Sequence, residues 1–269
     1  MKKSTGPIFV AALFLAGCAA PQFAPGPMMQ RYTAGVSVEN RSIEYLVIGA
    51  GPDVIFIMAA IHGNESAGVP LVYRLADYLQ QYPGLLTGRK VVLLPAANPD
   101  GIARNSRFNA NSVDLNRNFA APNRINDLQS GYAALSEPES GIIDRLIRRY
   151  SPNRIISLHQ PENPDTGWID YDGPADDLAG RIAEYSKLPV RKLGTFPGSL
   201  GAYAGAVLNI PIITIEQPLN TEGLDSERLW QRYGPALVAA VIYPDRIREG
   251  TNRTGRALDS PPQIGNNGK

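Results

Sequence analysis

Residues 53–68 read DVIFIMAAIHGNESAG, an apolar run followed by a loop of small and polar residues. A continuous apolar run of this length is typical of a strand that is buried on both faces of a sheet. The loop that follows contains His62, one of only two histidines in 269 residues, and Glu65 three positions later. This arrangement indicates either a metal site at the edge of an α/β sheet or a turn that contains the two residues by chance.

Strand-like and helix-like segments alternate along the rest of the chain. This alternation predicts an α/β fold with a mixed, mostly parallel sheet and helices on both of its faces. Because the chain has 269 residues and shows no internal repeat, we expect a single domain. Apolar runs predict strands over 43–49, 53–60, 90–98, 154–160 and 210–217, and apolar residues at helical spacing predict helices over 66–82, 136–150, 174–188 and 226–243.

The helix predicted over 136–150 carries signals for its start. Ser136 and Glu139 have the spacing of a capping box, in which each side chain bonds the backbone N–H of the other residue. Pro138 lies between them in the first turn, where a backbone N–H has no helical partner in any case. We therefore expect Ser136 to cap this helix.

Composition and charge argue against a protein that binds nucleic acid electrostatically. The chain has 26 Lys and Arg residues against 25 Asp and Glu residues, and its hydrophobic fraction of 43% is ordinary for a globular protein. No segment concentrates basic residues as the neutralisation of phosphates would require. We expect a monomer with no nucleic-acid partner.

The N-terminus has the pattern of an export signal. Residues 1–18 read MKKSTGPIFVAALFLAGC, with a basic start, an apolar run too short to span a bilayer, and the only cysteine of the chain, Cys18. The ending is similar to a bacterial lipobox, so we expect cleavage before Cys18 and lipidation of its sulfur. A plain signal peptide with an incidental cysteine is the alternative. The export signal and lipobox predict a periplasmic protein whose lipid is its only membrane anchor. The uncharged Ala19 after the cysteine favours the outer membrane over retention in the inner one.

Two segments flank the predicted domain. Residues 19–33 are rich in Pro and lack apolar periodicity, as expected of a tether between the lipid and the fold. Residues 247–269 are polar and rich in Gly, Asn and Pro, as expected of a disordered tail. The predicted folded domain is therefore 34–246.

Polar residues follow several of the predicted strands. His62 and Glu65 come after one strand, Asn98 follows another, and His159 and Glu216 each end a later strand. In α/β sheets, ligands bind at the carboxyl ends of the strands. We therefore expect these five side chains to meet at one edge of the sheet.

Three of these residues are candidate ligands of one zinc ion. A catalytic zinc site uses three protein ligands and keeps a fourth position open. A His-x-x-Glu pair at the start of a helix, here His62 and Glu65, supplies two ligands. The third is His159, the only other histidine. The alternative for His159 is a core histidine with a satisfied hydrogen bond.

Further motifs occur in the order of a known family. Residues 98–119 read NPDGIARNSRFNANSVDLNRNF, and residues 136–139 read SEPE. Together with the His-x-x-Glu pair, the second histidine and a late glutamate, they resemble the zinc carboxypeptidase (M14) family over about residues 40–240. The resemblance implies the fold of that family and a hydrolase that uses one zinc ion.

The resemblance also implies catalytic roles. The three candidate ligands correspond to the zinc ligands, and Glu216 corresponds to the general base that assists the attack of a zinc-activated water. Arg107 corresponds to the donor that stabilises the oxyanion of the tetrahedral intermediate. Arg104 is the competing candidate for that role.

Substrate-binding roles follow in the same way. Asn116 and Arg117 correspond to residues that hold the terminal carboxylate of the substrate, with which a guanidinium pairs through two parallel bonds. Taken alone, Arg117 is as consistent with a structural ion pair to Asp114.

Some segments are similar to murein tripeptide amidases, which cut between γ-D-glutamate and diaminopimelate. Leu200 lies where the family sets its side-chain preference. Asp170 or Asp172 could pair with the distal ammonium of diaminopimelate, and an acidic surface loop is the alternative for both. The similar segments are 107–119, 171–175 and 197–203.

We therefore predict a zinc metallopeptidase that hydrolyses a C-terminal amide bond of murein peptides. An N-acyl amino acid deacylase of the related branch is one alternative, and NPDG and SEPE favour the peptidase over it. A lipoprotein that only binds wall peptides is the other. Such a protein should lack a ligand or the base, and this chain has all of them.

Overall fold

A computed structural model describes residues 29–161, 166–218 and 224–244 of the chain. The predicted signal peptide with Cys18, most of the predicted tether and the predicted tail lie outside these residues. None of the described helices is long and apolar enough to cross a membrane.

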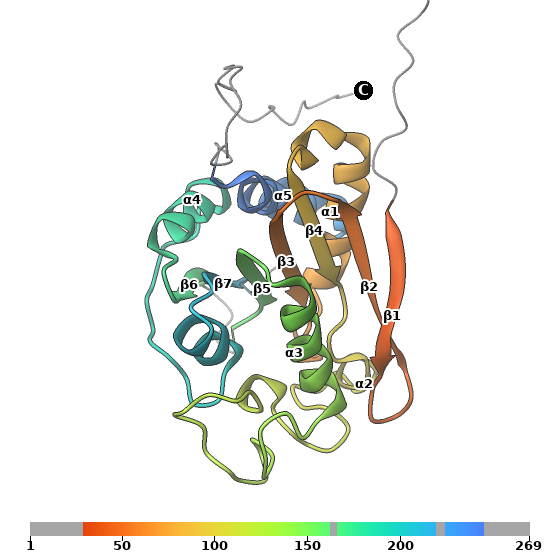
Figure 1. The fold of residues 1–269 in the computed structure, drawn as a ribbon, viewed down its shortest axis with the longest axis vertical. Coiled ribbons are helices and arrows are strands. Elements are labelled where there is room, and N and C mark those ends of the chain that lie inside the picture. The colour runs from red at the N-terminus through yellow and green to blue at the C-terminus, as the bar shows by residue number, and fades with distance from the viewer. Residues whose placement is uncertain (1–28, 162–165, 219–223, 245–269) are drawn as a thin grey trace, which may run out of the picture.

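A mixed sheet of seven strands runs through the described residues (Figure 1). Its strands, in chain order, are β1 (Gln30–Val36), β2 (Ser42–Gly49), β3 (Asp53–Ala59), β4 (Arg89–Leu94), β5 (Arg154–His159), β6 (Trp168–Asp172) and β7 (Ile212–Glu216). Their order across the sheet is β1-β2-β4-β3-β5-β7-β6. The four central strands, β4, β3, β5 and β7, are parallel, and antiparallel pairing adds β2 and β1 at one edge and β6 at the other.

Helices cover both faces of this sheet, as predicted. They are α1 (Gly68–Gln81), α2 (Pro99–Arg104), α3 (Pro138–Tyr150), α4 (Asp176–Ser186) and α5 (Ser226–Ile242), with the short helices η1 (Pro83–Leu86), η2 (Leu115–Arg117) and η3 (Ala202–Val207). Successive side chains of β3 point to opposite faces, so Ile57 packs in the core under α1, α4 and α5, and Phe56 packs in the core under α3 and η3. The predicted α/β fold class is confirmed.

The five predicted strands and four predicted helices are present, with ends that differ by a few residues. The two edge strands β1 and β6 were not predicted, because neither has a continuous apolar run. Strand β1 is mostly exposed, and it begins at Gln30, inside the segment predicted as a tether over 19–33. The folded part therefore begins earlier than the sequence indicates.

Helix α3 begins differently from the prediction. Its N-cap is Glu137, which makes no side-chain cap, and Ser136 Oγ donates to the carboxylate of Glu137 instead. The carboxylate of Glu139 accepts a bond from the backbone N–H of Val38, so it holds the turn between β1 and β2. The predicted capping box is therefore wrong, and only Pro138 in the first turn is confirmed.

Candidate active site

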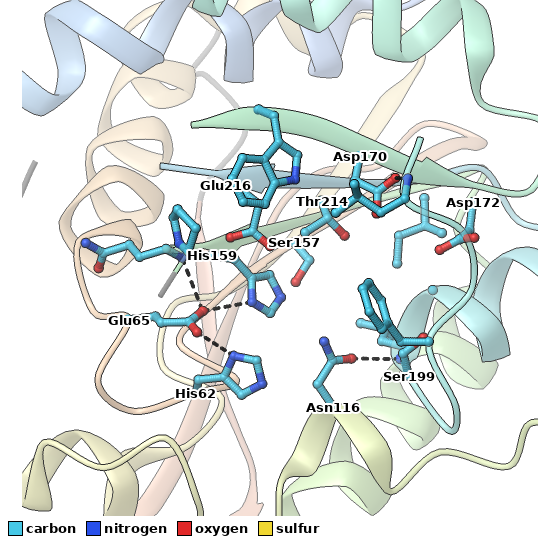
Figure 2. Close-up of a pocket in the computed structure, with 18 of the residues that line it drawn as sticks. His62, Glu65, Asn116, Ser157, His159, Asp170, Asp172, Ser199, Thr214 and Glu216 are labelled. Carbon is cyan, nitrogen blue, oxygen red and sulfur yellow. Dashed lines mark hydrogen bonds and ion pairs between the residues drawn. The ribbon is translucent and has the colours of Figure 1, made fainter. Parts of the chain in front are cut away.

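The carboxyl ends of the central strands line a pocket of about 430 Å³ (Figure 2). His62 follows β3, His159 ends β5 and Glu216 ends β7. His159 and Glu216 are direct neighbours in the register of β5 and β7. The predicted convergence at one edge of the sheet is confirmed for these three side chains and for Glu65, which also lines the pocket.

Asn98 does not join them. It is fully buried and caps α2, because its Oδ1 accepts a bond of 2.9 Å from the backbone N–H of Gly101. Its Nδ2 donates to the carbonyl of Ile61 at 3.3 Å. Asn98 therefore holds the loop that carries His62 and lies outside the pocket lining.

His62, Glu65 and His159 converge on one point (Figure 2). The Nδ1 atom of His62 lies 2.7 Å from Oε1 of Glu65, and the Nδ1 atom of His159 lies 2.8 Å from Oε2 of the same carboxylate. One potential ligand atom from each residue lies within 4.8 Å of the others, and all three residues are buried. The predicted helical setting is wrong, since both His62 and Glu65 precede α1, which begins at Gly68.

Asp114 determines which nitrogen of His62 faces the cluster. Its Oδ1 lies 3.1 Å from Nε2 of His62, and its Oδ2 accepts a bond of 3.1 Å from Nε of Arg107. A carboxylate on Nε2 keeps that nitrogen protonated and leaves Nδ1 as the ligand atom. The side chains that contact the carboxylate of Asp114 are therefore those of His62 and Arg107, and the alternative of an ion pair with Arg117 is not what the structure shows.

Opposite charges within the cluster shift its pKa values. Burial acts to raise the pKa of Glu65, but His62 and His159 outweigh burial and hold that pKa well below its usual value. Burial acts to lower the pKa of His62, but the carboxylates of Glu65 and Asp114 outweigh it and raise that pKa. Glu65 is therefore ionised at neutral pH and suited to bind a cation.

The carboxylate of Glu216 has different surroundings. Burial raises its pKa, the charge of Glu65 acts in the same direction, and His159 opposes both. A carboxylate whose pKa lies closer to neutrality is a better proton acceptor at physiological pH. Glu216 therefore has the electrostatic properties of a general base next to the cluster.

Arg107 reaches the cluster from the loop between α2 and η2. Its Nη1 donates to Oε1 of Glu65 at 3.2 Å, and its side chain lines the pocket. Arg104, the competing candidate, ion-pairs with Glu39 and does not line the pocket. Of the two arginines, only Arg107 is placed to contact a substrate.

Helix η2 places Asn116 and Arg117 on another wall of the pocket. Asp114 caps this helix by accepting a bond of 2.9 Å from the backbone N–H of Asn116. The side-chain Oδ1 of Asn116 accepts 2.8 Å from the backbone N–H of Leu200, a buried residue of the lining. Arg117 Nη1 donates to the carbonyl of Asn116 at 2.8 Å, and burial lowers the pKa of Arg117.

The pocket extends along the sheet in a second row of side chains (Figure 2). Side chains two residues apart on a strand share one face of the sheet, so this row lies directly behind His159 and Glu216. The register of β5, β7 and β6 aligns Ser157, Thr214 and Asp170 in it. Ser157 Oγ is buried and has no hydrogen-bond partner within the described part of the chain.

Asp172 lies one row further along β6, opposite Ile212. Burial raises the pKa of Asp172 and that of Asp170, and both side chains line the pocket. The alternative of an acidic surface loop is therefore wrong. The carboxylate of Asp170 also has protein contacts, since its Oδ1 accepts from the backbone N–H of Leu193 at 3.0 Å and from that of Tyr171 at 2.9 Å.

Comparison with known proteins identifies the family. A family model described as zinc carboxypeptidase matches residues 24–163, which include all three candidate ligands. The chain belongs to the zinc carboxypeptidase family. Glu216 lies beyond the matched segment.

Relatives of this zinc carboxypeptidase include murein peptide amidases. The chain is 35% identical over 180 residues to murein peptide amidase A of Escherichia coli K12, covering 60% of this chain and 70% of that protein. It is 28% identical over 190 residues to murein peptide amidase A of Vibrio campbellii, covering 64% and 72%. The crystal structure of murein-tripeptide amidase MpaA from Escherichia coli O157 superposes on this chain with a TM-score of 0.63 and 27% identity. The match covers 82% of this chain and 93% of the MpaA chain.

A more distant structure shares the fold. The crystal structure of carboxypeptidase A from Helicoverpa armigera has a TM-score of 0.63 at 18% identity and covers 82% of this chain and 70% of its own. The chain is therefore an enzyme of the zinc metallopeptidase class with a carboxypeptidase-like fold.

The donor set of this zinc carboxypeptidase fits its metal. Two imidazole nitrogens and one carboxylate, with a fourth position open, are a ligand set of catalytic zinc sites. Here the two Nδ1 atoms face the two oxygens of one carboxylate, and Asp114 supports His62 from behind. His62, Glu65 and His159 are therefore the residues that would hold a single zinc ion.

Several residues of the pocket were not found from the sequence. Ser157 and Thr214 lie inside apolar strands, and only the register between strands shows that they share a row with Asp170. Trp168 and Phe196 also line the pocket. Their positions depend on β6 and on a loop, and neither had a signal in the sequence.

Proposed function

We propose that this enzyme is a murein peptide amidase that releases the C-terminal diaminopimelate by cutting its bond to γ-D-glutamate. The observation that carries the proposal is the order of groups along one face of the sheet. The metal cluster and Glu216 form the first row, and hydroxyl and carboxylate groups form the rows behind them. A long side chain with a charged end fits this order.

The spacing of the rows supports a side chain of that length. Two residues of a strand span about 7 Å, so Asp170 lies about one such step, and Asp172 two, from the row that contains Glu216. The distal ammonium of diaminopimelate would then meet the carboxylates of β6. Ser157 Oγ, which is unpartnered among the described residues, lies in the same row as Asp170 and could accept or donate a bond there.

The terminal carboxylate of the substrate is assigned to η2. Arg117 offers a guanidinium that can bind a carboxylate through two parallel bonds, and Asn116 lies beside it. Both residues belong to the same short helix, so the carboxylate would be held at a fixed place relative to the metal cluster. This arrangement favours a peptide with a free C-terminus over an internal peptide bond.

The chemistry at the scissile bond follows from the groups in the first row. Bound zinc would supply a Lewis acid that polarises the carbonyl and lowers the pKa of water. Glu216 would accept a proton from the attacking water and pass it to the leaving nitrogen. Arg107 would donate to the oxyanion, a contribution on the order of 3 kcal/mol to the transition state.

We also propose that the enzyme works in the periplasm as an outer-membrane lipoprotein. The support is the pattern of residues 1–18 and the single cysteine, Cys18, at its end. Murein lies in the same compartment, so the anchor would keep the enzyme near its substrate. Labelling of cells with a fatty-acid analogue tests this, since wild-type chain should carry the label and Cys18→Ser should not.

The main experiment uses the full chain and L-Ala-γ-D-Glu-meso-diaminopimelate. We expect release of free diaminopimelate, detected by mass spectrometry, and loss of release after treatment with a zinc chelator. A second peptide that ends in norleucine, which lacks the ammonium and the second carboxylate, should be cut much more slowly.

Two outcomes would contradict the proposal. Zinc-loaded protein that does not release diaminopimelate would exclude this substrate. Equal rates for the diaminopimelate and norleucine peptides would show that the rows behind Glu216 do not recognise a charged side chain.

A further inference from the structure

Phe196 is a side chain of the pocket with no part in the reaction proposed above. It is 46% exposed, although a large aromatic ring gains free energy from burial. Its ring lies against Arg117, with 5.2 Å between the ring centroid and the central carbon of the guanidinium. A cation at this distance from a ring face is attracted to it electrostatically. The exposed ring therefore lies against a charged side chain, and the proposed function assigns that side chain to the substrate.

The loop that carries Phe196 is fixed to β6 on one side. Oδ1 of Asp170 accepts a bond of 3.0 Å from the backbone N–H of Leu193. Asp170 therefore binds this loop in addition to lining the pocket.

The same loop is fixed to the segment after η2 on its other side. Asn123 donates from Nδ2 to the carbonyl of Thr195 at 3.3 Å and accepts from the backbone N–H of Gly198 at 3.2 Å. Gly198 has a φ of +63°, and a Cβ there would lie 2.3 Å from the carbonyl oxygen of Arg117. The loop therefore packs directly on the backbone of Arg117, which sets the ring beside the guanidinium.

A fixed ring has a specific effect on an arginine that binds a carboxylate. Two parallel bonds to a carboxylate require that the guanidinium plane keep one orientation. A ring that lies against a guanidinium limits the movement of that group and shields part of it from water. Electrostatic attraction is stronger where water is excluded, so the covered guanidinium should bind a carboxylate more tightly.

We propose that Phe196 is a positioning residue for the terminal carboxylate of the substrate and acts through Arg117. Its ring holds the guanidinium plane in the orientation that binds the carboxylate and covers one of its faces. The assignment of the substrate's terminal carboxylate to Arg117 rests on the proposed function, whereas the contact between the Phe196 ring and the guanidinium does not.

The test uses the zinc-loaded full chain and three variants. Phe196→Ala removes the ring, Phe196→Tyr keeps it, and Tyr82→Ala removes an aromatic ring of similar exposure from the end of α1. The first measurement is the rate at which phenylglyoxal modifies Arg117, read by mass spectrometry of peptides, with Arg107 as the internal reference. It is made with and without acetate, the simplest carboxylate probe.

We expect Arg117 to react about fivefold faster in Phe196→Ala than in wild type, because the ring no longer covers it. Acetate should protect Arg117 less in Phe196→Ala than in wild type. For the murein tripeptide, KM should rise about fivefold with kcat nearly unchanged, since binding of the carboxylate is lost equally from the ground and transition states. Phe196→Tyr and Tyr82→Ala should behave as wild type in all three measurements.

Each result decides a separate point. Equal reactivity of Arg117 in wild type and Phe196→Ala overturns the proposal, as does equal protection by acetate. A fall in kcat at constant KM would overturn the positioning role, because it would indicate a disturbed reaction centre. If the wild type does not cut the tripeptide, the proposed function fails, and the modification rates still decide whether the ring serves a carboxylate site.

Discussion

Asp114 contacts two groups that belong to different parts of the site. One oxygen of its carboxylate faces Nε2 of His62, and the other accepts from Nε of Arg107. The pKa of Asp114 is held well below its usual value, since His62 and the charges of Arg107 and Arg117 outweigh the effect of burial. A single negative charge thus orients both a metal ligand and the proposed oxyanion donor.

The first prediction concerns this charge. Asp114→Asn keeps the shape of the side chain but removes its charge, so Nε2 of His62 is held less firmly. We expect zinc affinity to fall about 10- to 100-fold, as for other partners of ligating histidines, measured by competition with a chromogenic chelator. Asp177→Asn, an exposed acid of α4, is the matched control. Unchanged affinity in Asp114→Asn would contradict the supporting role.

The second prediction separates the base from the ligands. Glu216→Gln removes the proton acceptor and leaves His62, Glu65 and His159 in place. We expect kcat to fall by about 10²- to 10⁴-fold while the protein still binds one zinc ion per chain. Assays of product release and of metal content on the same sample check both parts. Loss of zinc in this variant would show that Glu216 contributes to metal binding.

At the scale of elements, the loop after β3 and helix α2 approach each other very closely. A Cβ on Gly63 would lie 1.9 Å from the backbone carbonyl carbon of Gly101. No side chain fits in that space, so the loop that carries His62 and Glu65 is held against the start of α2. The positions of His62 and Glu65 therefore depend on α2, a helix that the sequence did not predict.

The third prediction follows from this close approach. Gly63→Ala must push the ligand loop away from α2, so we expect the free energy of unfolding to fall by about 3 kcal/mol and zinc affinity to fall with it. Gly84→Ala in η1 is the control, because a Cβ there meets no atom within 4 Å, and its stability should stay within about 0.5 kcal/mol of wild type. Urea unfolding of the two variants measures the difference. Equal stability would mean that the loop can relax without cost.

Strand β6 gives the fourth prediction. Asp172→Asn removes a charge that lies two rows from Glu216 and keeps the size and shape of the side chain. We expect the ratio of kcat/KM for the diaminopimelate peptide over the norleucine peptide to fall about tenfold, since a charge-assisted bond contributes about 1.4 kcal/mol or more. The rate with the norleucine peptide should change little. A proportional loss with both peptides would instead indicate a displaced loop.

At the scale of the whole molecule, zinc should link parts of the chain that lie far apart in sequence. The ligands come from the loop after β3 and from the end of β5, which are separated by α1, β4, α2 and α3. A ligand that binds only the folded state raises the free energy of unfolding by about 2.7 kcal/mol at 100 times its dissociation constant. The metal should therefore act on the stability of the entire sheet.

The fifth prediction tests this linkage by calorimetry. Added zinc should raise the melting temperature of the metal-free chain by about 5 to 10 °C, because 1 kcal/mol corresponds to a few degrees for a domain of this size. Glu216→Gln should show the same rise. His159→Ala should not, and a rise of equal size in that variant would place the stabilising metal elsewhere.

The sequence predicted the centre of the molecule better than its edges. The strands β3, β4, β5 and β7 are buried on both faces, so they appear as continuous apolar runs. Polar residues at their carboxyl ends could then be placed on one edge without knowledge of the register. The same reasoning failed for Asn98, because a local bond to the start of α2 holds its side chain.

The rest of the site depends on contacts between distant segments. The pairing of Asp114 with Arg107 was missed, since the sequence shows only that both lie in one loop region. The register of β5 with β7 places Ser157 and Thr214 in one row of the pocket. The position of Phe196 depends on a loop that packs on the backbone of Arg117. Such contacts are set by packing in three dimensions, which no local pattern records.

The rows on β5, β7 and β6 also bear on how this family could diversify. Side chains that face the pocket recur at every second residue of each strand, and the first of these rows contains the metal cluster and Glu216. If the proposed function holds, substitutions in the rows behind it, at Ser157, Thr214, Asp170 or Asp172, change which terminal residue fits and leave the metal cluster in place. New substrate preferences could therefore arise by single exchanges on an unchanged backbone, with the hydrolytic chemistry inherited intact.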